Sequence, residues 1–315
     1  MTMTISKKAF SALELAIVLT IAGLLMTSVI IGTKASYTAK LNAARSLTVN
    51  SPVGRIKGLT LWLDAAGWFE GSAADSFVAS DINSSTASIG TWYDTKTNSS
   101  YKLNVTQGTA SKKPTYIKDA TNGLPSVKFD GGDNLTTASI TASNFVGTGS
   151  STTNSGSATV FLVQKYNSPL HRESSVWWQG SSPTQRFNIH AIYGDNQTLF
   201  WDFGTCVCDA TGRLSYVYTT ASDFMDKWNI ITVYKHSDAS AKIRVNAVVM
   251  ATSSAGTMTQ YFSSTSAATL FIGSGSNTNY LNGYISEVII YNRALSDNEI
   301  DDVEYYLSKK WGIII

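Results

Sequence analysis

The chain is poor in cysteine, histidine, proline and charged residues. Its 315 residues include 2 Cys, 3 His and 5 Pro, and 15% of them are charged. Cys206 and Cys208 are separated by one residue and there is no second pair, which excludes a four-ligand structural zinc site. They are a candidate disulfide, but so short a ring would clamp only one loop. We therefore expect no disulfide framework and no histidine metal centre.

The charges that are present divide unevenly along the chain. Residues 1–57 hold seven Lys or Arg and one Glu, which leaves 17 basic and 21 acidic residues in the remainder. A basic segment can bind nucleic acid, but these bases are better explained by a helix that packs among like helices. The whole chain, with 43% hydrophobic and 11% aromatic residues, has a globular composition. We therefore expect no nucleic-acid partner.

One long hydrophobic run, Phe10 to Ile31, lies near the start of the chain and carries a single charge, Glu14. As a helix the run is about 33 Å long, which is enough to cross a bilayer. A carboxylate inside such a helix costs about 2.5–3.5 kcal/mol on insertion. Anchoring alone does not explain that cost, so we interpret Glu14 as a charge that pairs with another group.

The nine residues from Lys7 to Leu15 resemble the N-terminal signal of type IV pilins and pseudopilins. The resemblance implies cleavage between Ala9 and Phe10, methylation of the new amino terminus at Phe10, and pairing of Glu14 with the amino terminus of a neighbouring subunit. The family usually has glycine where this chain has Ala9. Alternatives are a secretory signal peptide, which is cut after its apolar region, and a plain signal anchor.

The pilin resemblance also implies partners and a location. The partners are other pilin subunits, the prepilin peptidase/methylase and the pilus assembly machinery. The location is a single-pass protein of the inner membrane before assembly, and then an extracellular pilus or a periplasmic pseudopilus.

The remaining pattern divides the chain into a leader at 1–9, a helix at 10–50 with its membrane span at 10–31, a linker at 51–56 and one β domain at 57–315. Pro52 ends the helix because it cannot donate a backbone hydrogen bond. From Leu59 onward, short strands between Gly, Ser, Thr and Asn predict an antiparallel sandwich. The expected strands are Leu59–Asp64, Ser126–Phe129, Thr159–Lys165, Arg186–Ile192, Arg213–Tyr218, Trp228–Lys235, Arg244–Met250, Thr269–Ile272 and Gly283–Tyr291.

Several segments in this region resemble the laminin G-like, concanavalin A-like jelly roll, and together they span nearly all of 57–315. They are Leu61–Ala65, Thr91–Asp94, Phe129–Asp133, Trp228–Val233 and Asn282–Ser296. The resemblance implies an all-β fold whose relatives often hold sugars or proteins in loops beside a calcium ion.

The jelly-roll resemblance also implies a catalytic pattern to test, because some of these sandwiches are glycosidases with Glu-x-Asp-x-x-Glu on a strand. Glu299, Asp301 and Glu304 have that spacing. The surrounding apolar residues recur at helical intervals, however, and Ser296 with Glu299 forms a capping box. On a helix, Glu299 and Asp301 diverge by about 200°. We therefore predict a C-terminal helix and no enzymatic activity.

Binding is the better candidate. Asp130 and Asp133 flank a double glycine and are candidate calcium ligands, although a tight turn between strands explains the same residues. Aromatic side chains can stack on sugar rings, but in a sandwich more of them belong to the core. The candidates for a glycan ligand are Trp177, Trp178, Tyr193 and Trp201.

These observations predict a non-enzymatic subunit of a type IV pilus or related filament. Its helix serves assembly, and its jelly-roll head, displayed outside on a minor or tip subunit, binds a glycan or a surface protein. One alternative is a membrane-tethered lectin that does not polymerise. A second is a tethered glycan hydrolase.

Overall fold

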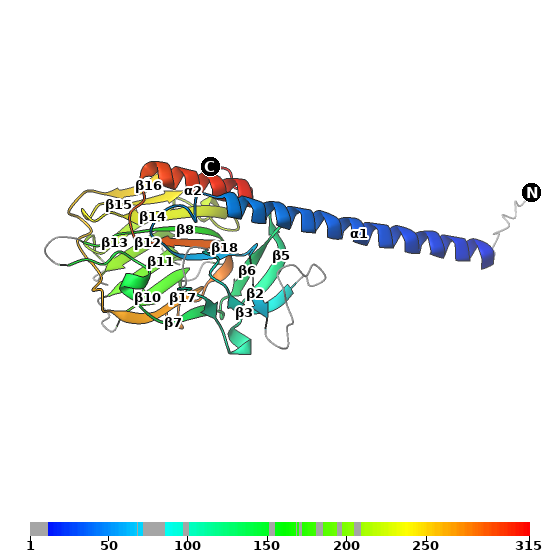
Figure 1. Ribbon diagram of the computed structural model, residues 1–315, viewed down its shortest axis with the longest axis horizontal. Helices are drawn as coiled ribbons and strands as arrows, with labels where there is room; N and C mark the ends of the chain where they lie inside the picture. The colour runs from blue at the N-terminus through cyan, green and yellow to red at the C-terminus, as the bar shows by residue number, and fades with distance from the viewer. Residues whose placement is uncertain are drawn as a thin grey trace, which may run out of the picture.

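The computed structural model describes residues 12–67, 69–71, 86–96, 101–150, 155–167, 169, 172–180, 185–193, 197–204 and 209–315. A long helix, α1 (Ala12–Asn50), extends from a β-rich head, and a second helix, α2 (Asp297–Trp311), lies on the head where α1 joins it (Figure 1). The head is therefore attached to one end of an extended helix.

The predicted helix at 10–50 matches α1 over its described residues, but the predicted membrane span at 10–31 is wrong. Within the described part of the chain, no helix has both the length and the apolar character needed to cross a membrane. This finding overturns the predicted location, which was a single-pass protein of the inner membrane before its assembly into a pilus or pseudopilus. Ala9 and Phe10 lie outside the described residues.

The head is an antiparallel sandwich, as predicted. In the first sheet, β18 pairs with β8 on one side and with β1 and β6 on the other, and the sheet continues from β8 to β14, β15 and β16 and from β6 to β5. Its strands are β1 (Leu59–Asp64), β5 (Thr115–Thr121), β6 (Leu124–Asp130), β8 (Ala158–Tyr166), β14 (Trp228–Lys235), β15 (Ala241–Val245), β16 (Val248–Ser253) and β18 (Asn282–Tyr291).

The second sheet runs in the order β13, β12, β11, β10, β17, β7, β4, β3 and β2, with β9 beside β11. Strand β3 also pairs with β5 and so joins both sheets. The strands of the second sheet are β2 (Phe69–Gly71), β3 (Thr86–Trp92), β4 (Val105–Thr106), β7 (Leu135–Thr141), β9 (Arg172–Glu173), β10 (Val176–Gln179), β11 (Arg186–Tyr193), β12 (Thr198–Gly204), β13 (Arg213–Val217) and β17 (Ala267–Ile272).

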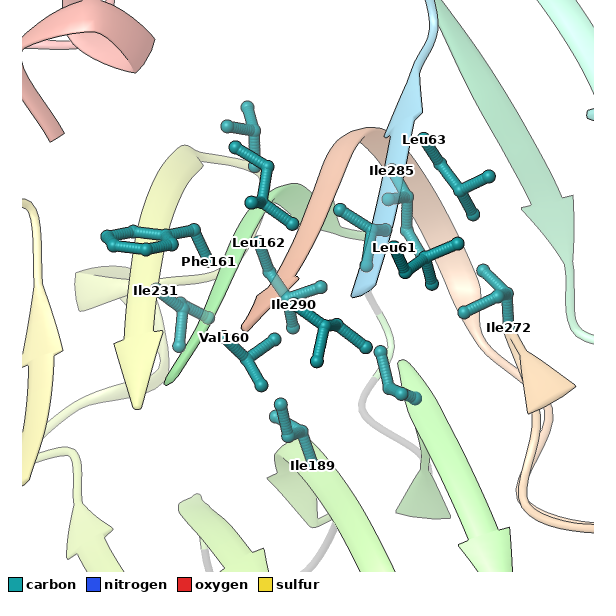
Figure 2. Close-up of a cluster of buried hydrophobic side chains, with 14 of the residues drawn as sticks. Leu61, Leu63, Val160, Phe161, Leu162, Ile189, Ile231, Ile272, Ile285 and Ile290 are labelled. Atoms are coloured by element: carbon teal, nitrogen blue, oxygen red, sulfur yellow. The ribbon is translucent and has the colours of Figure 1, made fainter. Parts of the chain in front are cut away.

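The hydrophobic core lies between the two sheets. Figure 2 shows Leu61 of β1 and Ile290 of β18 near Ile189 of β11 and Ile272 of β17, and all four side chains are fully buried. Alternation along each strand places every second side chain here. One predicted strand, Arg244–Met250, is instead a hairpin, because Asn246 and Ala247 both have positive φ and form a two-residue turn.

Helix α2 begins at the predicted capping box. The Ser296 hydroxyl accepts a hydrogen bond from the Glu299 amide, and the Glu299 carboxylate accepts one from the Ser296 amide. Gly312 ends the helix with a φ of 68°, in the left-handed region that favours glycine. The apolar face of α2 is buried against β8 and β14 and consists of Ile300, Val303, Leu307 and Trp311.

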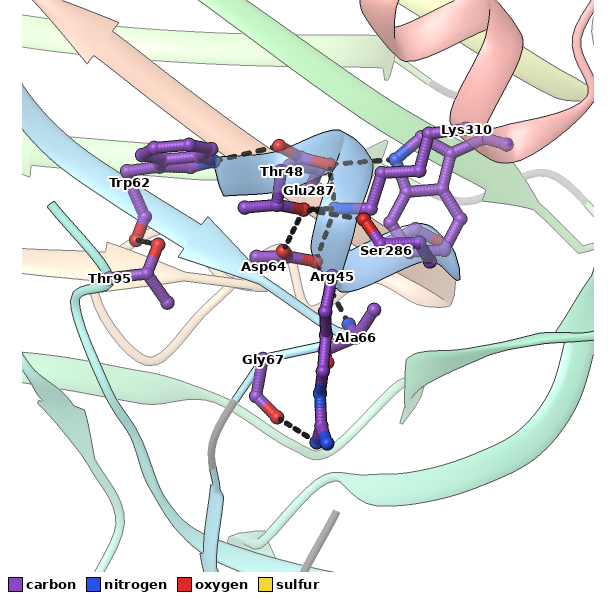
Figure 3. Close-up of polar contacts among 12 residues, drawn as sticks. Arg45, Thr48, Trp62, Asp64, Ala66, Gly67, Thr95, Ser286, Glu287 and Lys310 are labelled. Carbon is purple, nitrogen blue, oxygen red and sulfur yellow. Dashed lines mark hydrogen bonds and ion pairs between the residues drawn. The ribbon is translucent and has the colours of Figure 1, made fainter. Parts of the chain in front are cut away.

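Lys310, in the last turn of α2, is buried between two carboxylates (Figure 3). Its Nζ lies 2.7 Å from Oδ1 of Asp64 on β1 and 2.9 Å from Oε2 of Glu287 on β18. Burial raises the pKa of Glu287, and the positive charge of Lys310 opposes that rise. We call Asp64, Glu287 and Lys310 the buried ion network.

Neutral donors complete the buried ion network. The indole N–H groups of Trp62 and Trp311 donate to Glu287 at 2.7 and 2.8 Å, and the Tyr306 hydroxyl donates at 2.9 Å. Each carboxylate oxygen of Glu287 therefore has more than one partner. Such complete satisfaction is what makes buried charge tolerable.

The C-terminal half of α1 packs on the head and reaches the same network. Thr48 Oγ1 lies 3.0 Å from Asp64 Oδ2 and accepts a hydrogen bond from Lys310 Nζ at 2.9 Å. One turn earlier, Arg45 donates to the carbonyl of Ala66 at 3.1 Å. The network therefore joins α1, β1, β18 and α2.

We expect Lys310→Met to lower the free energy of unfolding by about 3–5 kcal/mol, because two carboxylates then share a buried site without their cation. Urea unfolding followed by tryptophan fluorescence measures the change. Lys309→Met is the matched control, since Lys309 is exposed and lies over the Tyr305 ring at 5.1 Å. Its expected effect is within about 0.5 kcal/mol. Equal losses in the two variants would contradict a stabilising role for the buried ion network.

Candidate functional site

The outer face of the second sheet, on the side away from the core, carries an unusual set of polar and aromatic side chains. Cross-strand partners share a face, so the pairing of Trp177 with Asn188, and of Asn188 with Asp202, places all three on this outer face. Their chain neighbours, such as Trp178, point into the core. Alternation along the strands therefore places one set of side chains on the outer face and their chain neighbours in the core.

Four aromatic rings form a continuous row across this face. The ring centroids are 6.1 Å apart between Trp177 and His190, 4.9 Å between His190 and Tyr193, and 5.7 Å between Tyr193 and Phe200. All three pairs have edge-on geometry, which aromatic rings prefer. The row therefore crosses strands β10, β11 and β12.

Three guanidinium groups lie over rings of this row. Arg186 is 5.0 Å from the ring centroid of Trp177, Arg172 is 5.0 Å from that of Tyr193, and Arg213 is 4.4 Å from that of Phe200. These distances lie within the range of cation–π attraction. We call the whole set the arginine–aromatic cluster: Arg172, Trp177, Arg186, Asn188, His190, Tyr193, Phe200, Asp202 and Arg213.

Asp202 holds two of the three arginines in place. Arg186 Nη2 lies 2.6 Å from Asp202 Oδ2, while Arg213 donates to the same carboxylate through Nε at 2.5 Å and Nη2 at 2.9 Å. Burial opposes ionisation of Asp202, but the two guanidinium groups outweigh it and hold its pKa below the usual value. Asp202 is therefore a charged anchor beneath the arginines.

His190 adds no positive charge near neutral pH. Burial lowers its pKa to about 4, and its Nδ1 lies 2.9 Å from the Glu173 carbonyl and 3.0 Å from the Ser174 hydroxyl. Among the described residues of the cluster, three arginines thus stand against one carboxylate.

Nε1 of Trp177 and Oδ1 of Asn188 are buried without a hydrogen-bond partner among the residues that the structure describes. Buried polar groups are normally paired, so an unpaired one indicates strain, a missing water or a ligand. Here both occur where the arginines and aromatic rings converge.

Two of the four aromatic residues predicted for ligand binding, Trp177 and Tyr193, belong to the cluster. The other two, Trp178 and Trp201, are fully buried between the sheets, so we leave them out of the candidate site. Sequence reasoning missed the three arginines and Asp202. The available signal was their position beside alternating aromatic residues, with Arg186 and Arg213 each at the start of a strand.

A family model described as the concanavalin A-like lectin/glucanases superfamily matches residues 121–301, which is more than half of the chain. This chain belongs to that superfamily. The predicted laminin G-like, concanavalin A-like jelly roll is thereby confirmed. The pilin-like segment lies outside the matched residues, so the pilin assignment stays a prediction. None of the curated proteins matches the chain.

Solved structures resemble this superfamily member in fold. A mutant of HCR/D has a TM-score of 0.50 at 13% identity, over 83% of this chain and 55% of that chain. The binding domain of botulinum neurotoxin serotype D/C has a TM-score of 0.45 at 13% identity, over 81% and 53%. Domain 4 of AbnA, a GH43 extracellular arabinanase from Geobacillus stearothermophilus in complex with arabinotriose, has a TM-score of 0.44 at 13% identity, over 63% and 82%. The chain spans about half the length of the first two.

Asp130 and Asp133 are the predicted calcium ligands; Asp130 is the last residue of β6, and Asp133 lies in the turn that follows it. The Asp130 amide donates to Asp133 Oδ2 at 3.2 Å, the Gly132 amide donates to Asp130 Oδ1 at 2.9 Å, and Gly131 has a φ of 92°. Within the described ranges, no group of three or more His, Cys, Asp or Glu residues could hold a metal ion. Turn geometry accounts for both carboxylates, and calcium binding stays a prediction.

The remaining sequence candidates fall elsewhere. Cys206 and Cys208 lie outside the described residues. Glu299, Asp301 and Glu304 lie on α2, and each has an arginine partner: Glu299 pairs with Arg293, and both Asp301 and Glu304 pair with Arg244.

The pH dependence of stability tests whether Asp133 is buried in this turn as a protonated carboxyl group. Burial raises the pKa of Asp133 to about 7, and the nearby charge of Asp130 adds to the rise. An unfolded chain loses this proton near the ordinary value of 3.8, so the stability that Asp133 contributes is present at low pH and is lost as the pH rises through about 7. We expect Asp133→Asn to flatten this decline in urea unfolding midpoints between pH 4 and 8.

Asp119→Asn, at an exposed position, is the matched control and should keep the decline. Calcium in the same titration tests the predicted cation site. A bound cation would lower the pKa of Asp133 and remove the decline, whereas an unchanged profile assigns Asp133 to the turn alone. A wild-type profile without any decline would contradict the raised pKa.

Proposed function

We propose that the head is a non-enzymatic carbohydrate-binding domain that holds its ligand at the arginine–aromatic cluster. Two findings support the proposal. The chain belongs to a superfamily named for lectins and glucanases. The cluster gathers rings, guanidinium groups and buried polar atoms that have no partner among the described residues, all on one sheet face. The cluster is the observation that carries it.

The chemistry of the cluster suits recognition. Guanidinium groups offer fixed, planar sets of N–H donors for hydroxyl and acidic oxygens. The indole N–H of Trp177 is a further donor, and it is buried without a partner among the described residues. A ligand acceptor that bonds to it would remove the cost of that unmet hydrogen bond. Binding sites of this kind combine aromatic surface with a few convergent polar groups.

The absence of catalysis is also part of the proposal. The carboxylates with glycosidase-like spacing lie on α2, where helical geometry separates Glu299 from Asp301. Glu304 is buried and binds Thr232 at 2.6 Å and Arg244 at 2.8 Å. These contacts support a role for the acids in fixing α2 to the first sheet.

We expect Trp177→Ala to weaken glycan binding by at least about tenfold, because the aromatic row loses its terminal ring and Arg186 loses the ring over which it lies. A glycan array with the full chain selects the ligand, and isothermal titration calorimetry measures its Kd. Trp177→Phe keeps a ring and loses only the N–H donor, which guards against misfolding of the alanine variant.

Tyr305→Ala is the matched control, since Tyr305 also lies beneath a cation, Lys309, but on α2 and away from the cluster. Its Kd should match that of the wild type. A glycan that binds equally well to the wild type and both Trp177 variants would place the binding site elsewhere, and no bound glycan would overturn the proposal.

A second function is favoured by α1, and we propose that this helix assembles copies of the chain into a filament of the pilin type. Large apolar side chains stand exposed along its described N-terminal half: Leu15 is 55% exposed, Leu19 63% and Met26 67%. Apolar surface on this scale favours association. Glu14 lies at the start of the same helix, where the pilin resemblance implies pairing with the amino terminus of a neighbour.

We expect Leu19→Glu to abolish self-association of the full chain, because a charge on the contact surface would be buried without a partner. Sedimentation velocity measures the association, and Ser36→Glu, at an exposed position nearer the head, should leave it unchanged. Mass spectrometry tests the processing, since the pilin role requires a methylated amino terminus at Phe10. A monomeric wild type with an intact leader would contradict this second proposal.

A further inference from the structure

We propose that Lys310 and Asp64 become joined by an isopeptide bond between Lys310 Nζ and Asp64 Cγ, which forms inside the buried ion network and releases one water molecule. The ion pair described above is the state before the bond forms. Three observations support the bond: the contact between the two reacting groups, the position of Glu287 beside the amine, and the burial of all three side chains (Figure 3).

The first observation is the contact between the amine and the carboxyl group. Lys310 Nζ lies 2.7 Å from Asp64 Oδ1, and the carbon that carries this oxygen is one bond further away. The nitrogen is therefore within about 4 Å of the carbon, close to the roughly 3–3.5 Å of groups that are ready to react. The two residues come from the first strand and the last helix, so the fold replaces a rare encounter by a fixed contact.

The second observation is that Glu287 is placed to move protons. Its Oε2 lies 2.9 Å from Lys310 Nζ, and the indole N–H groups of Trp62 and Trp311 hold the carboxylate at 2.7 and 2.8 Å. Burial raises the pKa of Glu287, so it takes up a proton more readily than an exposed glutamate does. Glu287 can therefore act first as a base and then as an acid.

The reaction balances without an oxidant or any other reagent. Glu287 takes a proton from the Lys310 ammonium group, and the lone pair of the neutral amine attacks Asp64 Cγ to form the C–N bond. Two protons in all pass from the nitrogen, through Glu287, to one Asp64 oxygen, which leaves as water when its C–O bond breaks. The product is a neutral amide, and Glu287 ends in the protonation state in which it began.

The Asp64 carboxyl group is also oriented for this attack. The Ala66 amide donates to Asp64 Oδ1 at 2.9 Å, and the Thr48 hydroxyl donates to Oδ2 at 3.0 Å. An amine that attacks the carbon pushes negative charge onto these two oxygens. Donors that are already in place on both of them stabilise that charge.

The third observation is burial. The side chains of Lys310 and Glu287 are fully buried, and that of Asp64 is 1% exposed. Holding an ammonium and a carboxylate away from water is costly, and their conversion into a neutral amide removes that cost. Exclusion of water also protects the amide from hydrolysis. The bond would tie β1, the first strand after α1, to α2 and so close the head covalently.

Peptide mapping of the denatured wild-type chain tests the bond directly. Trypsin cleaves after unmodified lysine and arginine but not after an acylated Lys310, so the bond predicts a branched peptide that joins residues 58–96 to 310–315. The mass of this peptide is lower than the sum of its two linear parts by the mass of one water molecule. We expect it to replace the linear peptide 58–96 in a chain that has folded near neutral pH. A map with the linear peptide alone would overturn the proposal without any variant.

Three variants test the roles of the residues, and circular dichroism checks that each one folds. Lys310→Arg keeps a cation between the carboxylates but has no amine to attack, so its branched peptide should be absent. Glu287→Gln keeps the shape of the side chain but cannot carry the protons. Its bond should form at least about a hundredfold more slowly, as samples taken at intervals after cell-free synthesis would show.

Lys309→Arg is the matched control, because Lys309 is exposed and the substitution keeps the trypsin site beside Lys310. It should form the bond as fast as the wild type. A branched peptide in Lys310→Arg, or one that joins 310–315 to a segment without Asp64, would show that the bond has been assigned to the wrong residues. A wild-type rate in Glu287→Gln would remove Glu287 from the reaction.

Discussion

The buried cation of Lys310 holds together segments from both ends of the chain. Asp64 and Glu287 lie on neighbouring strands and Thr48 lies on α1, yet all three contact the ammonium group of Lys310 on α2. Removing these charges from water is costly, and their mutual attraction offsets that cost only when the geometry is complete. Two indole N–H groups and a tyrosine hydroxyl supply that completeness around Glu287. A shift of β1 against β18 by one residue would leave these charges unpaired, so the network selects one register.

The pairing register of β1 and β18 also fixes the positions of the strands around them. Strand β18 is paired along its length with β8 and contributes Ile290 to the core, and the core supports the second sheet from within. The outer face of that sheet then carries the arginine–aromatic cluster. In Figure 1, strands β10 to β13 lie at the end of the head away from the free part of α1. A ligand on the cluster and a partner on the exposed helix can therefore be accommodated at the same time.

Local sequence signals were sufficient where the structure depends on neighbours in the chain. The capping box at Ser296 and Glu299 and the alternating strands correctly indicated α2 and the sandwich. Long-range pairings were not accessible in the same way. Alternation shows that Trp177 and Trp178 face opposite sides but does not show which faces the core, and Asp202 meets Arg186 and Arg213 only through strand register. The apolar run from Phe10 to Ile31 misled in another way, because hydrophobicity reports a need for burial without naming what buries it.

Two clusters of buried charge in this head differ in how completely their polar groups are paired, and the contrast argues for different roles. The buried ion network has two carboxylates for one cation, its charged side chains are at most 1% exposed, and neutral donors satisfy the remainder. The arginine–aromatic cluster has Asp202 between Arg186 and Arg213, whose side chains are 11% and 18% exposed, and beside them lie buried polar atoms without a partner in the described part of the chain. A satisfied network has no capacity for a ligand, so its role is to fix the fold. The arginine–aromatic cluster differs, because the indole N–H of Trp177 and the amide oxygen of Asn188 are buried without a partner among the described residues and keep that capacity.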